Sequence, residues 1–138
     1  MKQICICILV SLLSFAAIGQ YRSDSVCKRQ TINVNAFVKG YPYQNKIYIS
    51  KDSLLNGFSL DLSDNSYKII GFKIFYEFPG DPFGESVIIG NKITTQNLSF
   101  IPNLKELGNG YFELFCIAIE KNGKKYNARD FVIVLADK

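Results

Sequence analysis

Two carboxylates in one loop, Asp81 and Glu85, are the residues of this chain best suited to acid–base chemistry. A pair of carboxylates can act as general acid and general base on either side of a reacting bond. These two flank a turn rich in proline and glycine and follow no catalytic motif, so solvated loop charges are the simpler interpretation. We therefore expect no catalytic residue and predict that the protein is not an enzyme.

Metal and cofactor sites are hard to build from this composition. The chain contains no histidine, which removes the commonest general base and a usual zinc ligand. Asp61, Ser63 and Asn65 have the oxygen spacing of a calcium loop. However, Ser66 stands where such a loop needs glycine, and Phe72 stands where it needs the closing acid. We expect a plain turn here, no metal site and no cofactor.

Two cysteines lie outside the apolar N-terminal stretch, Cys27 and Cys116. In an oxidising compartment they could pair, and the chain-entropy model gives such a loop a stabilisation of about 4 kcal/mol. The alternative is a buried free thiol at Cys116, because its neighbours in the sequence are apolar on both faces. The sequence leaves both alternatives open.

Aromatic side chains are in surplus, with 11 Phe and 8 Tyr. Tyr41 and Tyr43 flank a proline turn, and Phe83 lies between a proline and a glycine in the later loop. Exposed rings of this kind can stack on sugars or anchor a protein partner. Tyrosines that pack into a small core are the simpler alternative. Tyr41, Tyr43 and Phe83 are thus the candidate interaction surface.

The N-terminus has the three-part pattern of a secretory signal peptide. Lys2 supplies the positive start, residues 4–18 are mostly apolar, and small residues precede a cleavage site between Gly19 and Gln20. The apolar run is shorter than a membrane-spanning helix requires, although a retained N-terminal anchor is the alternative. We expect cleavage after Gly19 and a protein that works in the periplasm or outside the cell.

The rest of the chain is predicted to form one domain. Residues 20–30 are polar and lack a period, so we expect a flexible leader, and residues 31–138 contain short β-type segments separated by turns. Residues 31–38 alternate apolar and polar side chains. The segment 68–78 places Ile70, Phe72, Ile74, Tyr76 and Phe78 on one face, and a mixed surface with Lys73, Phe75 and Glu77 on the other. This pattern predicts an all-β fold, a small antiparallel sandwich.

A hairpin is predicted around Asn122 and Gly123, since this dipeptide favours the positive φ angles of a type I′ turn. The two flanking apolar runs then pair by charge and by packing. The predicted pairs are Lys121 with Lys124, Glu120 with Lys125, Leu114 with Phe131, and Phe112 with Ile133.

The strand 68–78 and the hairpin together carry a resemblance to a known family. Their order, with a Leu-x-x-Gly stretch before the hairpin, resembles the C-terminal domain of the gliding-motility protein GldM family of Bacteroidetes, a periplasmic part of type IX secretion. The resemblance covers about residues 58–136. The matching positions, which resemble core and turn positions of the family, are Asp61, Phe72, Phe78, Leu107, Gly110, Ala118, Gly123 and Arg129.

The resemblance implies an immunoglobulin-like sandwich that works by protein contact, often as a homodimer. Family members also carry an N-terminal membrane helix and further periplasmic domains, so a direct motor role does not follow. A net charge of +4 is too small to argue for a nucleic-acid partner. We expect a non-enzymatic protein-interaction module of the bacterial cell envelope, with a small glycan-binding module as the alternative.

Overall fold

The structure, a computed structural model, describes residues 27–80, 83–99 and 110–136. Regular structure within these residues is almost entirely β-strand, which confirms the all-β prediction. Two short helices are present, α2 (Lys51–Leu55) and η1 (Gln96–Leu98). The strands are β1 (Thr31–Val38), β2 (Lys46–Ser50), β3 (Phe58–Leu62), β4 (Lys68–Glu77), β5 (Gly84–Ile89), β6 (Lys92–Ile93), β7 (Tyr111–Lys121), β8 (Lys124–Arg129) and β9 (Phe131–Ala136).

Several sequence predictions concern residues outside the described part of the chain. These are the signal peptide, its cleavage site at Gly19 and Gln20, most of the leader, the carboxylate of Asp81, and Leu107.

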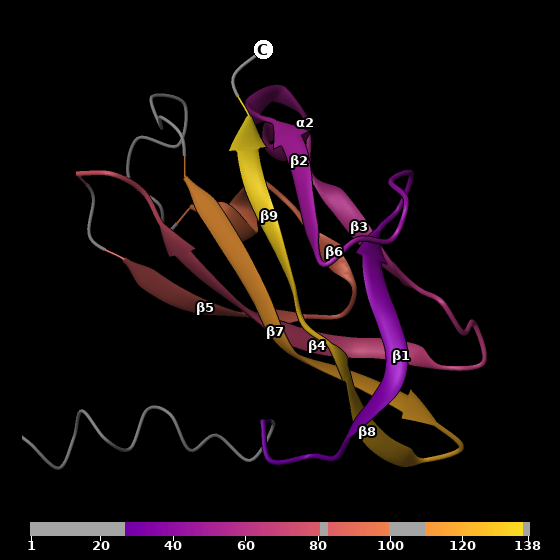
Figure 1. Ribbon diagram of the computed structural model, residues 1–138. Coiled ribbons are helices and arrows are strands. Elements are labelled where there is room, and N and C mark those ends of the chain that lie inside the picture. The colour runs from indigo at the N-terminus through magenta and orange to yellow at the C-terminus, as the bar shows by residue number, and fades with distance from the viewer. Residues whose placement is uncertain (1–26, 81–82, 100–109, 137–138) are drawn as a thin grey trace, which may run out of the picture.

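The strands join into one continuous hydrogen-bonded path that bends around a single core (Figure 1). The order is β2-β9-β7-β8-β1-β3-β6, and β4 pairs with both β5 and β7. Strand β7 is central, because β4 pairs along one of its edges while β9 and β8 share the other. The path is not divided into two separate sheets, so the immunoglobulin-like sandwich stays a prediction.

Two pairings correct the prediction of a purely antiparallel fold. Strand β1 runs parallel to β8, with Thr31 opposite Asn127, and β2 runs parallel to β9, with Lys46 opposite Val132. Alternation of apolar residues fixes which face of a strand is buried, but it carries no information about the direction of a partner far away in sequence. The prediction was therefore wrong at these two pairings.

The C-terminal hairpin forms in the predicted register. Asn122 and Gly123 adopt positive φ angles of 51° and 74°, as a type I′ turn requires. All four predicted pairs are confirmed: Lys121 with Lys124, Glu120 with Lys125, Leu114 with Phe131, and Phe112 with Ile133.

Strand β4 departs from its predicted alternation at one end. Phe72, Ile74 and Tyr76 are buried as expected, but Ile69 is buried in place of Ile70. The pairing with β7 shifts register after Ile69, so one extra residue of β4 stands against β7 there. A bulge of this kind reverses the face of the residues before it.

Candidate functional site

Five neighbouring strands, β5-β4-β7-β9-β2, present a second face that points away from the core. Residues directly opposite in neighbouring strands share a face, so the pairing places them together. Phe75, for example, lies between Glu85 of β5 and Glu113 of β7. We call this surface the outer face. Its members are Glu85, Val87, Ile89, Gly71, Lys73, Phe75, Glu77, Tyr111, Glu113, Phe115, Val132, Val134, Lys46 and Tyr48.

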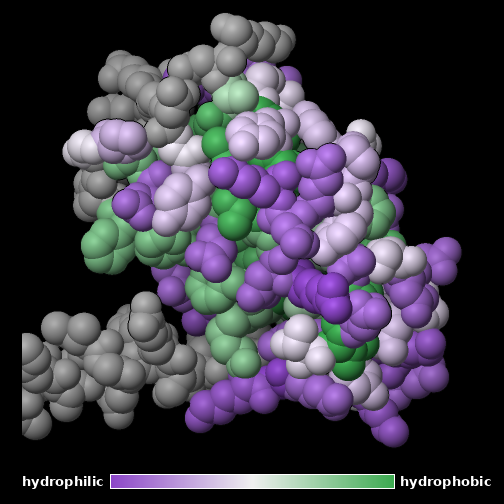
Figure 2. Space-filling view, viewed as in Figure 1, coloured by the Kyte–Doolittle hydropathy of each residue, from purple (hydrophilic) through white to green (hydrophobic). Residues whose placement is uncertain are grey.

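Large apolar side chains are exposed on the outer face and beside it. Ile89 is 83% exposed, Phe83 is 73% exposed, Tyr48 is 58% exposed and Val87 is 55% exposed. In Figure 2 hydrophobic side chains are visible at the left of the view, in the region of β5, and others lie nearer the middle, with hydrophilic side chains between them. Contiguous exposed apolar surface on a small domain is typical of a binding surface.

A groove of about 590 Å³ opens on the outer face. Gly84 forms part of its wall. A Cβ at this position would collide with the ring of Tyr76, so a larger residue does not fit there. We call this the outer groove. It is lined by Cys27, Lys73, Phe75, Phe83, Gly84, Glu85, Glu113 and Phe115.

The charge at the centre of the groove is a buried lysine. Lys73 is only 4% exposed, and its Nζ donates to Glu85 Oε1 at 2.8 Å. The same ammonium lies 6.0 Å from the ring centroid of Phe115. An ammonium taken out of water needs such partners, since leaving it uncompensated would cost several kcal/mol.

Aromatic rings continue from the groove along β4 and β7. The ring of Phe75 lies 6.0 Å from that of Phe83 and 6.3 Å from that of Tyr111. The Tyr111 hydroxyl donates to Glu77 Oε2 at 2.7 Å. This hydrogen bond raises the pKa of Tyr111, and the negative charges of Glu77 and Glu113 act in the same direction.

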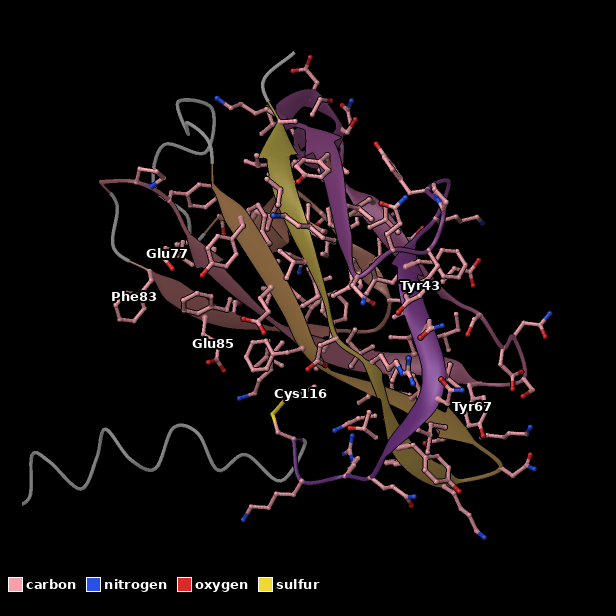
Figure 3. The ribbon with its side chains drawn as sticks, in the orientation of Figure 1. Tyr43, Tyr67, Glu77, Phe83, Glu85 and Cys116 are labelled. Atoms are coloured by element: carbon pink, nitrogen blue, oxygen red, sulfur yellow. A yellow bond between two sulfur atoms is a disulfide. The ribbon has the colours of Figure 1, made fainter. Side chains whose placement is uncertain are left out.

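Cys27 and Cys116 form a disulfide in the structure, which decides between the two alternatives that the sequence left open. Cys116 has a positive φ of 48° and lies where β7 changes its neighbour from β9 to β8 and where its register with β4 shifts. Such a bulge bends the strand and turns a side chain out of the ladder. The bond at Cys116 thereby holds the segment before β1 against the outer face (Figure 3). Cys27 forms part of the groove lining.

Asp130, between β8 and β9, lies beside this bulge. Partial burial raises the pKa of Asp130, although much of the residue still touches solvent. A hydrogen bond from the backbone N–H of Cys116 opposes the shift, and the negative charge of Glu113 adds to it.

We expect the wild type to gain stability relative to Asp130→Asn as the pH falls from neutral through the pKa of Asp130. The folded protein binds this proton at a pH where the unfolded chain, with the ordinary value of 3.8, is still ionised. Urea unfolding of both proteins across this pH range measures the difference. Asp64→Asn is the control of opposite sign, because hydrogen bonds from Ser66 lower the pKa of Asp64. Two difference curves of the same sign would contradict the assignment.

The three aromatic candidates from the sequence do not form one site. Tyr41 packs against the core, and the Tyr43 hydroxyl donates to Asn45 Oδ1 at 2.7 Å. Figure 3 places Tyr43 on the opposite side of the molecule from Phe83. Of the three, only Phe83 lines the outer groove.

The remaining sequence candidates are engaged in local structure. Glu85 pairs with Lys73 rather than with a second acid. Asp61 lies in β3, where its carboxylate accepts the backbone N–H of Leu62, and a turn follows in which the carboxylate of Asp64 accepts the backbone N–H of Ser66. Within the described residues, no three His, Cys, Asp or Glu side chains cluster so that they could hold a metal ion.

Sequence reasoning missed the contribution of β7 to the site. The alternation in β7 could have predicted that three residues share a face, because they alternate with core residues: Tyr111, Glu113 and Phe115. Their position beside Phe75 could not have been predicted, because paired residues of β4 and β7 are more than thirty positions apart and no short-range pattern indicates which strands pair.

Comparison of the chain with protein-family models, curated proteins and solved structures gave no match. In the described part of the chain, no helix is long and apolar enough to cross a membrane.

Proposed function

We propose that the protein is an exported, non-enzymatic module of the bacterial cell envelope that binds another envelope protein on its outer face. The observation that carries this proposal is the exposed apolar surface of Phe83, Val87 and Ile89 beside the outer groove. The disulfide supports export, since such bonds persist in oxidising compartments. A link to secretion or gliding machinery rests on the sequence resemblance alone.

The edge of β5 supports a protein partner over a small ligand. Among the described strands β5 pairs only with β4, so its other edge is open. Proteins usually guard open edges with charged side chains, proline or a bulge. The segment Gly84–Ile89 contains no proline or bulge, and its one charge, Glu85, is paired with Lys73 of the neighbouring strand. An extended segment of a partner can add to such an edge through backbone hydrogen bonds.

Crosslinking in the native cell, followed by mass spectrometry of proteins held by a C-terminal tag, tests this function. We expect an envelope protein to be captured by the wild type and to be lost, by about tenfold or more, in Ile89→Glu, because a carboxylate there would be desolvated at the interface. Gln44→Glu, which adds the same charge to an exposed turn, is the matched control and should capture as the wild type does.

Two outcomes would contradict the proposal: no captured protein, or equal capture by Ile89→Glu. Binding of a glycan panel by the wild type, lost in Phe83→Ala, would favour the glycan-binding alternative instead, since Phe83 is the one aromatic candidate that lines the groove.

A further inference from the structure

The outer groove has a local charge opposite to that of the whole chain. The chain carries a net charge of +4, yet the groove holds Glu85 and Glu113 against Lys73. Glu77 and Asp130 lie beside it, and the charge of Glu113 acts on both Tyr111 and Asp130. Arg29 lines a neighbouring hollow together with Lys73, Val87 and Ile89, and Lys46 lies on the other side, beyond Val132 of β9. The lining of the groove, with two carboxylates and one ammonium, is therefore negative on a chain that is basic as a whole.

One half of the groove already accommodates a cation. Lys73 places its ammonium between the carboxylate of Glu85, at 2.8 Å, and the ring of Phe115, with 6.0 Å to the centroid. A carboxylate and an aromatic face are the two groups that stabilise a partly desolvated ammonium. The protein thus binds one basic side chain of its own at this site.

The other half repeats this arrangement without a lysine. Glu113 lies directly opposite Phe75, on the side away from Glu85. Tyr111 shares its face two residues earlier in β7 and contacts the Phe75 ring. Among the residues that the structure describes, Glu113 has no ion-pair partner.

We propose that this half of the groove binds a lysine or arginine side chain of the partner protein, held by Glu113 and the rings of Phe75 and Tyr111. The inference rests on the proposed function, because it names the chemistry of the partner at that site. The partner segment is extended and lies across the outer face over β5 and β4, because Glu113 on β7 is two strands in from the open edge of β5. Alternate side chains of such a segment point to the outer face, so one basic residue enters the groove while apolar residues two positions away from it cover Val87 and Ile89.

The test uses a fluorescein-labelled hexapeptide, Val-Ser-Lys-Ser-Val-Ser, whose valines and lysine share one face when the peptide is extended, with glutamate in place of lysine as the control peptide. Fluorescence anisotropy with the disulfide-intact protein should show binding of the lysine peptide and none of the glutamate peptide. Glu113→Gln should weaken binding by about tenfold or more, because a charge-assisted hydrogen bond is lost, and Glu113→Lys should abolish it. Asp52→Asn removes one carboxylate on α2, off the outer face, and should bind as the wild type does.

Equal binding of both peptides, wild-type affinity in Glu113→Gln, or no binding of the lysine peptide would each overturn the inference. The crosslinking experiment separates this failure from failure of the proposed function. A partner that is captured by the wild type, lost in Ile89→Glu and retained in Glu113→Lys would leave the function standing and remove the basic side chain from it.

Discussion

Replacing both cysteines, Cys27→Ser and Cys116→Ser together, is expected to lower the free energy of unfolding by about 4 to 5 kcal/mol. The bond joins residues 89 positions apart, and in the chain-entropy model a cross-link acts by restricting the unfolded chain, more so for longer loops. A single domain of this size has only about 5 to 15 kcal/mol in total. The double variant should therefore unfold at a much lower urea concentration.

Reduction of the wild type supplies the control for this prediction. The reduced wild type should unfold with the double variant, while added reductant should not move the midpoint of the double variant. Coincident midpoints for the oxidised wild type and the double variant would show that the cross-link contributes nothing. A partial loss would point to residual structure in the unfolded chain.

Local chemistry decided which parts of the fold could be predicted. The hairpin at Asn122 and Gly123 was predictable because its turn and its cross-strand pairs lie within one short stretch. The parallel pairing of β1 with β8 was not, because Thr31 and Asn127 are brought together only by the folded core. Helices begin with a capping residue, and α2 has one: the Ser50 hydroxyl accepts the backbone N–H of Ser53. That pattern could have been found in the sequence, but a helix of five residues gives no periodicity.

The site was predictable only strand by strand. The mixed face of β4, with Lys73 and Phe75, was visible in its alternation, and the loop around Phe83 was visible in its prolines and glycines. The groove needs three strands, and the pairing of β4 with β7 is set by long-range packing. From the sequence alone, the carboxylate of Glu113 therefore cannot be distinguished from an ordinary solvated charge, because its cross-strand neighbour Phe75 is not known.

Phe112→Ala is expected to cost about 3 to 5 kcal/mol of stability, the range for removing a fully buried phenylalanine. Phe112 is completely buried, and its ring packs edge-on against that of Phe78 with 5.2 Å between centroids. Phe78 in turn fills the space over Gly110, where a Cβ would collide with its ring. The ring of Phe78 is thus confined by the backbone on the side of Gly110.

The matched control deletes the same side chain from the other face of the sheet. Phe75 is half-buried on the outer face, so Phe75→Ala should cost about 1 kcal/mol, since little apolar area returns to water. The same variant removes the ring that faces Glu113 and should weaken binding of the lysine peptide, whereas Phe112→Ala, assayed where it remains folded, should not. Urea unfolding should therefore show the larger stability loss for Phe112→Ala, and anisotropy should show the larger loss of peptide binding for Phe75→Ala. If Phe75→Ala were as destabilising as Phe112→Ala, the outer face would be part of the core, and its apolar surface would give no reason to expect a partner there.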